Sequence, residues 1–258
     1  ENRAGASGNI GTEAVAKAAP DGYTLLIASP SSISVNPALN PKLGYSAKDL
    51  MPITKVTSSP LVLAASNASG ITSVSDLIAK AKKAPGSLNY ATSGNGSAPH
   101  LGAALFSRVA GVQMVHIPFK GAGEATLALL SGTIDFQFAS TPGVMGNVKG
   151  GKVRLLAISG TKRLTAVPDV PTFTEAGVPN FGLVNFTGLW APKGTPQAVV
   201  DRLQKEVATA MASADMKAFA EGIASEPGYW DAATFARDLH ERTAYWGKVA
   251  ANTAFERQ

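Results

Sequence analysis

The sequence lacks cysteine and has few charged residues. Among its 258 residues there is no cysteine, only three are histidine, and 16% are charged. The absence of cysteine excludes disulfide frameworks, thiol catalysis and cysteine-based zinc sites. No apolar run reaches the roughly 18 residues that a membrane-spanning helix needs. The hydrophobic content of 45% is nevertheless sufficient for one or two domains with a substantial core.

The net charge and the spacing of the histidines indicate which ligands the protein could bind. The net charge is +5, and the basic residues are spread along the chain without a cluster. This distribution favours small anions and argues against a nucleic-acid partner. The histidines, His100, His116 and His240, show no metal-ligand spacing. We therefore expect no metal and no cofactor.

Apolar runs alternate with helical patterns, which indicates an α/β fold. Strands are expected at 23–28, 61–65, 88–91, 114–119, 134–139, 153–158 and 184–191. Helices are expected at 9–18, 74–84, between Pro99 and Gly111, up to Ser131, at 196–213 and at 232–252. Ser73 should cap the helix at 74–84, with Asp76 as its partner three residues on.

We interpret the chain as two small α/β domains. Residues 1–62 and 188–258 would form domain 1, and residues 63–187 would form domain 2. The chain would cross between them at hinges near 61–68 and 184–191. The sequence opens at Glu1 in the manner of mid-domain sequence, so we expect that processing or truncation has removed something upstream.

The segment NYATSGNGSAPHLG, residues 89–102, fits none of the reactive glycine-rich loops. A dinucleotide fingerprint would need glycine in place of Pro99, and a phosphate-binding P-loop would need Gly-Lys-Ser/Thr. A nucleophile elbow needs glycine two residues before and after its serine, and neither Ser93 nor Ser97 has this spacing. The loop therefore does not predict nucleotide binding or nucleophilic catalysis.

Hydroxyl and glycine residues follow five of the expected strands. These segments are 29–32, 92–97, 120–121, 139–141 and 159–161. The carboxyl ends of parallel strands share one edge of a sheet, where ligands bind. Exposed amides, hydroxyls and helix N-termini at that edge would suit an anion without any proton transfer.

Ordinary structural roles compete with this interpretation. Serine and glycine are common turn and capping residues, and Lys120 would more often be a solvated surface charge. Each lone histidine is more often structural than functional, although His100 falls in the first turn of a helix beside the 92–97 loop. Asp135 and Asp169 would form a catalytic pair only if the fold brought them together. We therefore expect a binding protein and not an enzyme.

Several stretches in order resemble one known family. They are ENRAGASGNIGTEAVAKAAPDGYTLL at the start, NPAL at 36–39, LNYATSGNGSAPHL, HIPFKGAGEA, LAISGTKR and DVPTFTEAG. Together they resemble the Bug-type solute receptors, which are the extracytoplasmic binding proteins of tripartite tricarboxylate transporters. The resemblance covers essentially the whole chain.

The resemblance implies a two-domain periplasmic-binding-protein fold of type II, which closes around its ligand by hinge motion. It implies a monomeric periplasmic protein that captures a small organic carboxylate between its domains and delivers it to membrane transporter subunits. Carried over residue by residue, the ligand-binding positions would be Ser29, Ser31, Ser32, Thr92, Ser93, Asn95, Gly96, Ser97, Lys120, Gly121, Ala139, Ser140 and Thr141.

One departure from the family pattern and two alternative functions stay open at the level of sequence. Family members carry an initial strand and a Pro-Gly-Gly loop upstream of the ENR segment, so domain 1 is expected to lack its first strands if these are absent from the protein. An effector-binding domain of a regulator is an alternative function, and it would require a DNA-binding region upstream. An enzyme acting on a carboxylate, with His100 or Lys120 as the base, is a further alternative.

Overall fold

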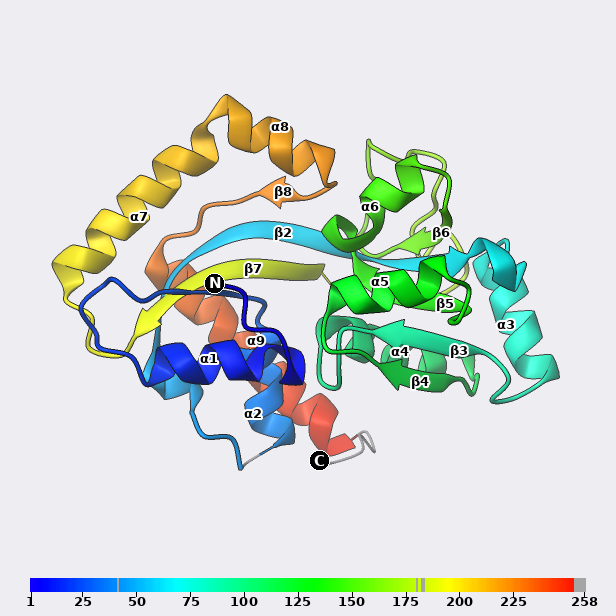
Figure 1. Ribbon diagram of the computed structural model, residues 1–258, viewed down its shortest axis with the longest axis horizontal. Coiled ribbons are helices and arrows are strands. Elements are labelled where there is room, and N and C mark those ends of the chain that lie inside the picture. Colours follow the sequence, from blue (N-terminus) through cyan, green and yellow to red (C-terminus); the bar gives the residue numbers. More distant parts are fainter. Residues whose placement is uncertain (41, 180, 182–183, 253–258) are drawn as a thin grey trace. The chain divides into compact units, whose positions relative to one another are not determined.

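The computed structural model describes residues 1–40, 42–179, 181 and 184–252 (Figure 1). The chain forms two compact units. Unit 1 comprises Glu1–Ser58, Phe186–Ala220 and Glu226–Gln258, and unit 2 comprises Ser59–Asn185 and Glu221–Ser225. The long crossings lie at 58/59, just before the hinge expected near 61–68, and at 185/186, within the hinge expected near 184–191. The return of 221–225 to unit 2 has no counterpart in the expected domains.

Unit 2 is a five-stranded sheet with helices packed on it. Its elements in chain order are the second half of β2 (Leu50–Ser66), α3 (Val74–Lys83), β3 (Asn89–Thr92), α4 (Ala98–Ala110), β4 (Val115–Pro118), α5 (Ala122–Leu130), β5 (Phe136–Ser140), α6 (Thr141–Lys149) and β6 (Val153–Ile158). The strand order is β6-β2-β5-β3-β4. β3 is parallel to both β4 and β5, while β2 is antiparallel to β5 and β6.

β2 is longer than the strand that the sequence predicts. Only 61–65 was expected as a strand, but β2 runs for 17 residues and passes from unit 1 into unit 2. The first half of β2 is not predicted from the sequence, because proline is uncommon inside strands and this part of the chain contains Pro52 and Pro60. The register pairs Leu61 with Ser140, so β2 enters unit 2 beside the end of β5 and must run opposite to it. The sheet of unit 2 is therefore mixed, with β2 antiparallel to β5 and β6.

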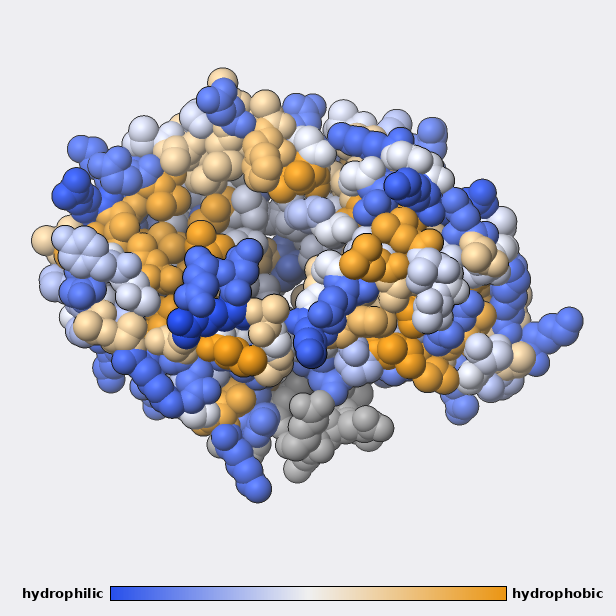
Figure 2. Space-filling view, in the orientation of Figure 1, coloured by the Kyte–Doolittle hydropathy of each residue, from blue (hydrophilic) through white to orange (hydrophobic). Residues whose placement is uncertain are grey.

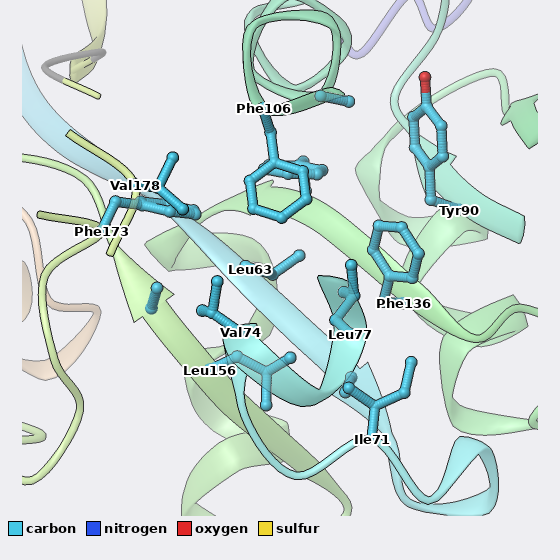
Figure 3. Packing of buried hydrophobic residues seen from close by; sticks show 14 of the residues in the cluster. Leu63, Ile71, Val74, Leu77, Tyr90, Phe106, Phe136, Leu156, Phe173 and Val178 are labelled. Atoms are coloured by element: carbon cyan, nitrogen blue, oxygen red, sulfur yellow. The ribbon is translucent and has the colours of Figure 1, made fainter. Parts of the chain in front are cut away.

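The core of unit 2 is aromatic and aliphatic. Leu63, Phe106, Phe136 and Phe138 are each fully buried within one cluster. Figure 3 shows Phe106 pointing from α4 into this cluster and Tyr90 lying beside Phe136. This packing fixes α4 against β5, and with it the loop that connects β3 to α4.

Local signals at α3 are confirmed. The Ser73 hydroxyl accepts a hydrogen bond from the Asp76 N–H at 3.0 Å, which caps the helix. The Asp76 carboxylate in turn accepts from the Thr72 N–H at 3.0 Å and lies 3.2 Å from Lys80 Nζ. These contacts satisfy N–H groups that have no partner within the helix.

Unit 1 combines a small sheet with several helices. Its elements are α1 (Asn9–Ala16), β1 (Leu26–Ala28), a π-helical turn at Ser31–Val35, α2 (Asn36–Leu39), the first half of β2, β7 (Val184–Pro192), α7 (Gln197–Ala212), most of α8 (Ala214–Gly222), β8 (Glu226–Pro227) and α9 (Ala232–Asn252). β1 and β8 pair antiparallel with β7 and β2 respectively. Trp190 and Phe186 pack on Phe235 of α9 with ring centroids 5.3 and 5.6 Å apart.

The sequence analysis did not predict several short elements. The helices α2, α6 and α8 and the two-residue strand β8 have no expected counterpart. α6 begins directly after β5 with Thr141 and Pro142, where proline fits the first turn. The expected Ala-Ser-Thr turn is therefore the junction of a strand and a helix.

The surface of unit 2 carries scattered apolar side chains. Leu127 on α5 is 68% exposed and Val115 on β4 is 44% exposed. Figure 2 shows apolar atoms at the surface over both elements, next to hydrophilic side chains. None of the helices in the described part of the chain is both long and apolar enough to cross a membrane.

Candidate anion-binding site

Four loops that contain hydroxyl or glycine residues leave one edge of the unit 2 sheet. β3, β4, β5 and β6 all run in the same direction, so the segments after them, at 92–97, 120–121, 140–141 and 159–161, leave the same edge. The Phe119 N–H donates to the Thr92 carbonyl at 3.1 Å and ties the ends of β3 and β4 together. The expectation of a shared edge is confirmed for these four segments. It is wrong for 29–32, which follows β1 in unit 1.

The 92–97 loop is held in one conformation by its own polar groups. Gly94 and Gly96 have φ of 121° and 74°, a region that favours glycine. The Thr92 hydroxyl accepts from the Gly94 N–H at 3.2 Å. The Ser97 hydroxyl donates to the Gly94 carbonyl at 2.7 Å and accepts from the His100 N–H at 3.3 Å, which caps α4.

The hydrogen bonds within the 92–97 loop distinguish residues that shape the loop from residues that could contact a ligand. The Gly96 N–H donates to His100 Nδ1 at 3.0 Å, and the Ser97 and Thr92 hydroxyls are bonded within the loop. Ser93 and Asn95 are only half-buried, and no hydrogen bond between described residues uses the Ser93 hydroxyl. We conclude that Thr92 and Ser97 shape the loop, while Ser93 is placed to offer a donor.

Two further helix N-termini lie at this edge. Gly121 precedes α5 and Ser140 precedes α6, and neither caps its helix with a side chain. The N–H groups in the first turn of α5, and those of Thr141 and Gly143 in α6, therefore have no partner within their helix and carry partial positive charge, whereas Pro142 has no N–H. Lys120 is exposed beside α5, and its N–H donates to Glu124 Oε2 at 3.3 Å.

Contacts around α6 hold its N-terminus in place. The Ser140 hydroxyl accepts from Asn185 Nδ2 at 2.9 Å, and the Thr141 hydroxyl donates to the Ala224 carbonyl at 2.8 Å. Ala139 is buried in the sheet, so any contribution of Ala139 would come from its backbone. Leu61 N–H donates to the Ser159 hydroxyl at 2.8 Å on the other side of β2.

The expected residues of unit 1 lie in a different setting. Ser29 and Ser32 line a groove of about 940 Å³ formed by the N-terminal residues, α1 and β1. Ser31 and Ser32 are 2% and 0% exposed, and the Ser32 hydroxyl accepts from the Thr12 hydroxyl at 2.8 Å. These serines stay predictions as ligand contacts.

The edge offers hydrogen-bond donors rather than catalytic groups. Within the described residues, no group of three or more histidine, cysteine, aspartate or glutamate side chains is placed to hold a metal ion. Burial lowers the pKa of His100 to about 4, and burial together with the neighbouring His100 lowers the pKa of His116 to about 4. Both imidazoles are therefore neutral at pH 7.

Sequence reasoning missed two residues of this edge. Asn185 lies 45 positions from Ser140, and its Oδ1 is buried without a hydrogen-bond partner among the described residues. His116 was treated as a lone histidine, yet its ring stacks on His100 with centroids 4.3 Å apart. No short motif links either pair, so only the tertiary fold could bring them together.

Comparison with solved structures defines the class of protein. The chain superimposes on the periplasmic binding protein BugD with a TM-score of 0.94 at 30% identity, covering 100% of this chain and 87% of that one. An R. palustris protein solved with adipate gives 0.93 at 32% identity, covering 97% and 84%. MatC from Rhodopseudomonas palustris with bound malate gives 0.88 at 30% identity, covering 95% and 85%. The fold is therefore that of periplasmic binding proteins.

Comparison with sequences gives the family. BugT of Bordetella pertussis is 38% identical over 228 residues, which are 88% of this chain and 69% of BugT. A UPF0065 protein from the tcbD-tcbE intergenic region of a Pseudomonas species is 36% identical over 218 residues, which are 84% of this chain and 65% of that protein. Residues 1–254 match the family described as the tripartite tricarboxylate transporter family receptor, and the chain belongs to that family. The resemblance inferred from the motifs is confirmed, and the family is one of receptors rather than enzymes.

Proposed function

We propose that this protein is a receptor that binds a small organic carboxylate and delivers it to a membrane transporter. The observation that carries the proposal is the edge of unit 2, where three helix N-termini follow parallel strands and two of them lack a side-chain cap. Such N–H groups bind anions without exchanging protons. The adipate and malate in two related structures support a dicarboxylate as the ligand.

The hydrogen bonds that this edge can donate are sufficient for micromolar binding of a carboxylate. Each hydrogen bond to a charged group contributes roughly 1.5–3 kcal/mol, so four or five such bonds support a Kd of about micromolar after the entropy losses of association. The proposal places the protein in the periplasm, because BugD, which shares its fold, is a periplasmic binding protein. It takes one chain as the binding unit, because every loop of the unit 2 edge comes from a single chain.

Calorimetric titration against a panel of acids tests the proposal. The panel contains malate, adipate and succinate, with the corresponding diamides as uncharged controls. We expect at least one acid to bind and its diamide not to bind. Ser93→Ala should weaken that binding about tenfold, through the loss of one charge-assisted bond of about 1.4 kcal/mol.

A matched control and a second variant sharpen this test. Ser131→Ala removes an exposed hydroxyl at the C-terminal end of α5, and it should leave the Kd unchanged. Ser29→Ala in the same titration tests whether unit 1 contributes a contact, as the sequence predicts. If no acid binds, or if acid and diamide bind equally, the proposal of a carboxylate receptor is wrong.

A further inference from the structure

Four aromatic rings form a continuous stack beneath the 92–97 loop. His100 of α4 lies on His116 of β4 with centroids 4.3 Å apart and planes 9° apart. His116 lies on Tyr90 of β3 at 5.0 Å, and Tyr90 lies on Phe136 of β5 at 5.6 Å. The strand register pairs Phe136 with Tyr90 and Tyr90 with His116, so the row is built into the sheet.

Both histidines are hydrogen-bonded to the loop. His100 Nδ1 accepts the Gly96 N–H at 3.0 Å, and His116 Nε2 lies 2.7 Å from the Thr92 hydroxyl. That hydroxyl also accepts from the Gly94 N–H. The two rings thus hold the loop at its beginning and at its second glycine.

We propose that His100 and His116 are positioning residues, which lock the 92–97 loop in its anion-binding conformation while neutral and release it when protonated. The inference rests on the proposed function of that loop. A proton on His100 Nδ1 would face the Gly96 N–H at 3.0 Å, and two donors cannot share that contact. A charge on both stacked rings would also add direct repulsion.

The ionisable groups around the two histidines lie on β3, β4, β5 and α4. Tyr90, which faces His116 from β3, stays protonated because burial raises its pKa to about 12. Asp135, next to Phe136 on β5, accepts from the Asn89 N–H at the far end of the strands. Arg108 lies in the last turn of α4, and Lys120 follows β4 at the surface.

The pH dependence of amide chemical shifts in the ligand-free protein tests whether the two histidines hold the 92–97 loop. In ¹H–¹⁵N spectra, the Gly96 amide should keep a constant shift down to about pH 5 and move as His100 titrates, because burial lowers the pKa of His100 to about 4. His100→Asn keeps an acceptor at the position of Nδ1 but cannot gain a proton, so its Gly96 amide should not move. His240→Gln removes an exposed histidine of α9 and should behave like the unmodified protein.

Binding then tests positioning, with malate or adipate as the probe. His100→Ala should weaken binding about tenfold at pH 7.5, whereas His100→Asn should stay within about threefold. Lowering the pH should weaken binding of the probe to the unmodified protein more than to His100→Asn. The probe's own carboxylates titrate identically in both experiments. The ratio of the two Kd values at each pH therefore reports only the effect of protonating the histidine.

The two proposals fail in different ways. If the probe binds and His100→Ala matches the unmodified protein in Kd and in pH profile, the positioning role is wrong and the receptor function stands. If the Gly96 amide titrates identically in His100→Asn, the lock is wrong whatever binds. If His100→Ala does not fold, His116→Gln replaces it, and a tenfold loss with a flattened pH profile is again expected. If no acid binds but the amide result is as expected, the receptor function is wrong and only the lock stands.

Discussion

At the scale of single residues, the hydroxyls of the 92–97 loop have unequal roles. From the sequence, Ser93 and Ser97 are predicted to have the same role, as hydrogen-bond donors to an anion. In the structure the Ser97 hydroxyl both donates to the Gly94 carbonyl and accepts from the His100 N–H, while Ser93 is half-buried. Serine spacing cannot show this difference, because it depends on which way the chain turns at two glycines with positive φ.

Ser97→Ala should destabilise the protein. It removes the N-cap of α4 and a buried hydrogen bond, which together cost about 1–2 kcal/mol in free energy of unfolding. Urea denaturation followed by circular dichroism measures this loss. Ser93→Ala serves as the control, and equal stability of the two variants would contradict a capping role for Ser97.

At the scale of elements, β2 organises both units. It supplies pairing partners for β5 and β6 in unit 2 and for β8 in unit 1. The sequence reveals its apolar second half but not its first half, because two prolines and a lysine interrupt the pattern there. The direction of β2 relative to its neighbours follows from where the chain enters unit 2.

Leu63→Ala should destabilise unit 2 strongly. Leu63 is fully buried at the centre of the main cluster (Figure 3), and truncation of such a side chain costs about 2–5 kcal/mol. Thermal or urea denaturation measures the effect. Leu127→Ala, which truncates an exposed leucine of α5, should change the free energy of unfolding by less than about 0.5 kcal/mol. Similar losses in both variants would contradict the packing described.

At the scale of the whole molecule, two half-buried histidines and three carboxylates make stability depend on pH. Burial lowers the pKa of His100 and His116 to about 4. A hydrogen bond from Arg163 lowers the pKa of Glu175. Hydrogen bonds from the backbone N–H groups of Thr72 and Thr234 lower the pKa of Asp76 and of Asp231 respectively. The histidines therefore favour the folded state when neutral, and the three carboxylates favour it when charged.

Stability should decline with acid in two stages. Between about pH 6.5 and pH 4 the unfolded chain binds more protons than the folded one at the two histidines, so the free energy of unfolding falls as the pH is lowered. The three carboxylates add their loss only as the pH falls below about 4.5, through their own lowered pKa values. Urea denaturation across this range measures both stages.

Replacing one buried histidine should reduce the first stage of this acid response. His116→Gln removes one buried base, and the slope of unfolding free energy against pH between about 6.5 and 4 should flatten. His240→Gln, which removes an exposed histidine, should keep the original slope. An unchanged slope in His116→Gln would contradict the burial of this ring.

The sequence by itself determined the fold class, most strands and long helices, and the family. These follow from local periodicity, from capping residues such as Ser73, and from motifs that run in order along the chain. It also identified five segments rich in hydroxyl and glycine residues, and four of them share one edge of the unit 2 sheet, because parallel strands place their carboxyl ends together.

Only the tertiary structure decided which groups at that edge hold the loop and which face outward. The stacking of His100 on His116 and the bond from Asn185 to Ser140 join residues 16 and 45 positions apart. Such contacts depend on strand register and helix packing, and no local pattern encodes them. The reversed direction of β2 has the same origin, since it depends on the point at which the chain enters the sheet.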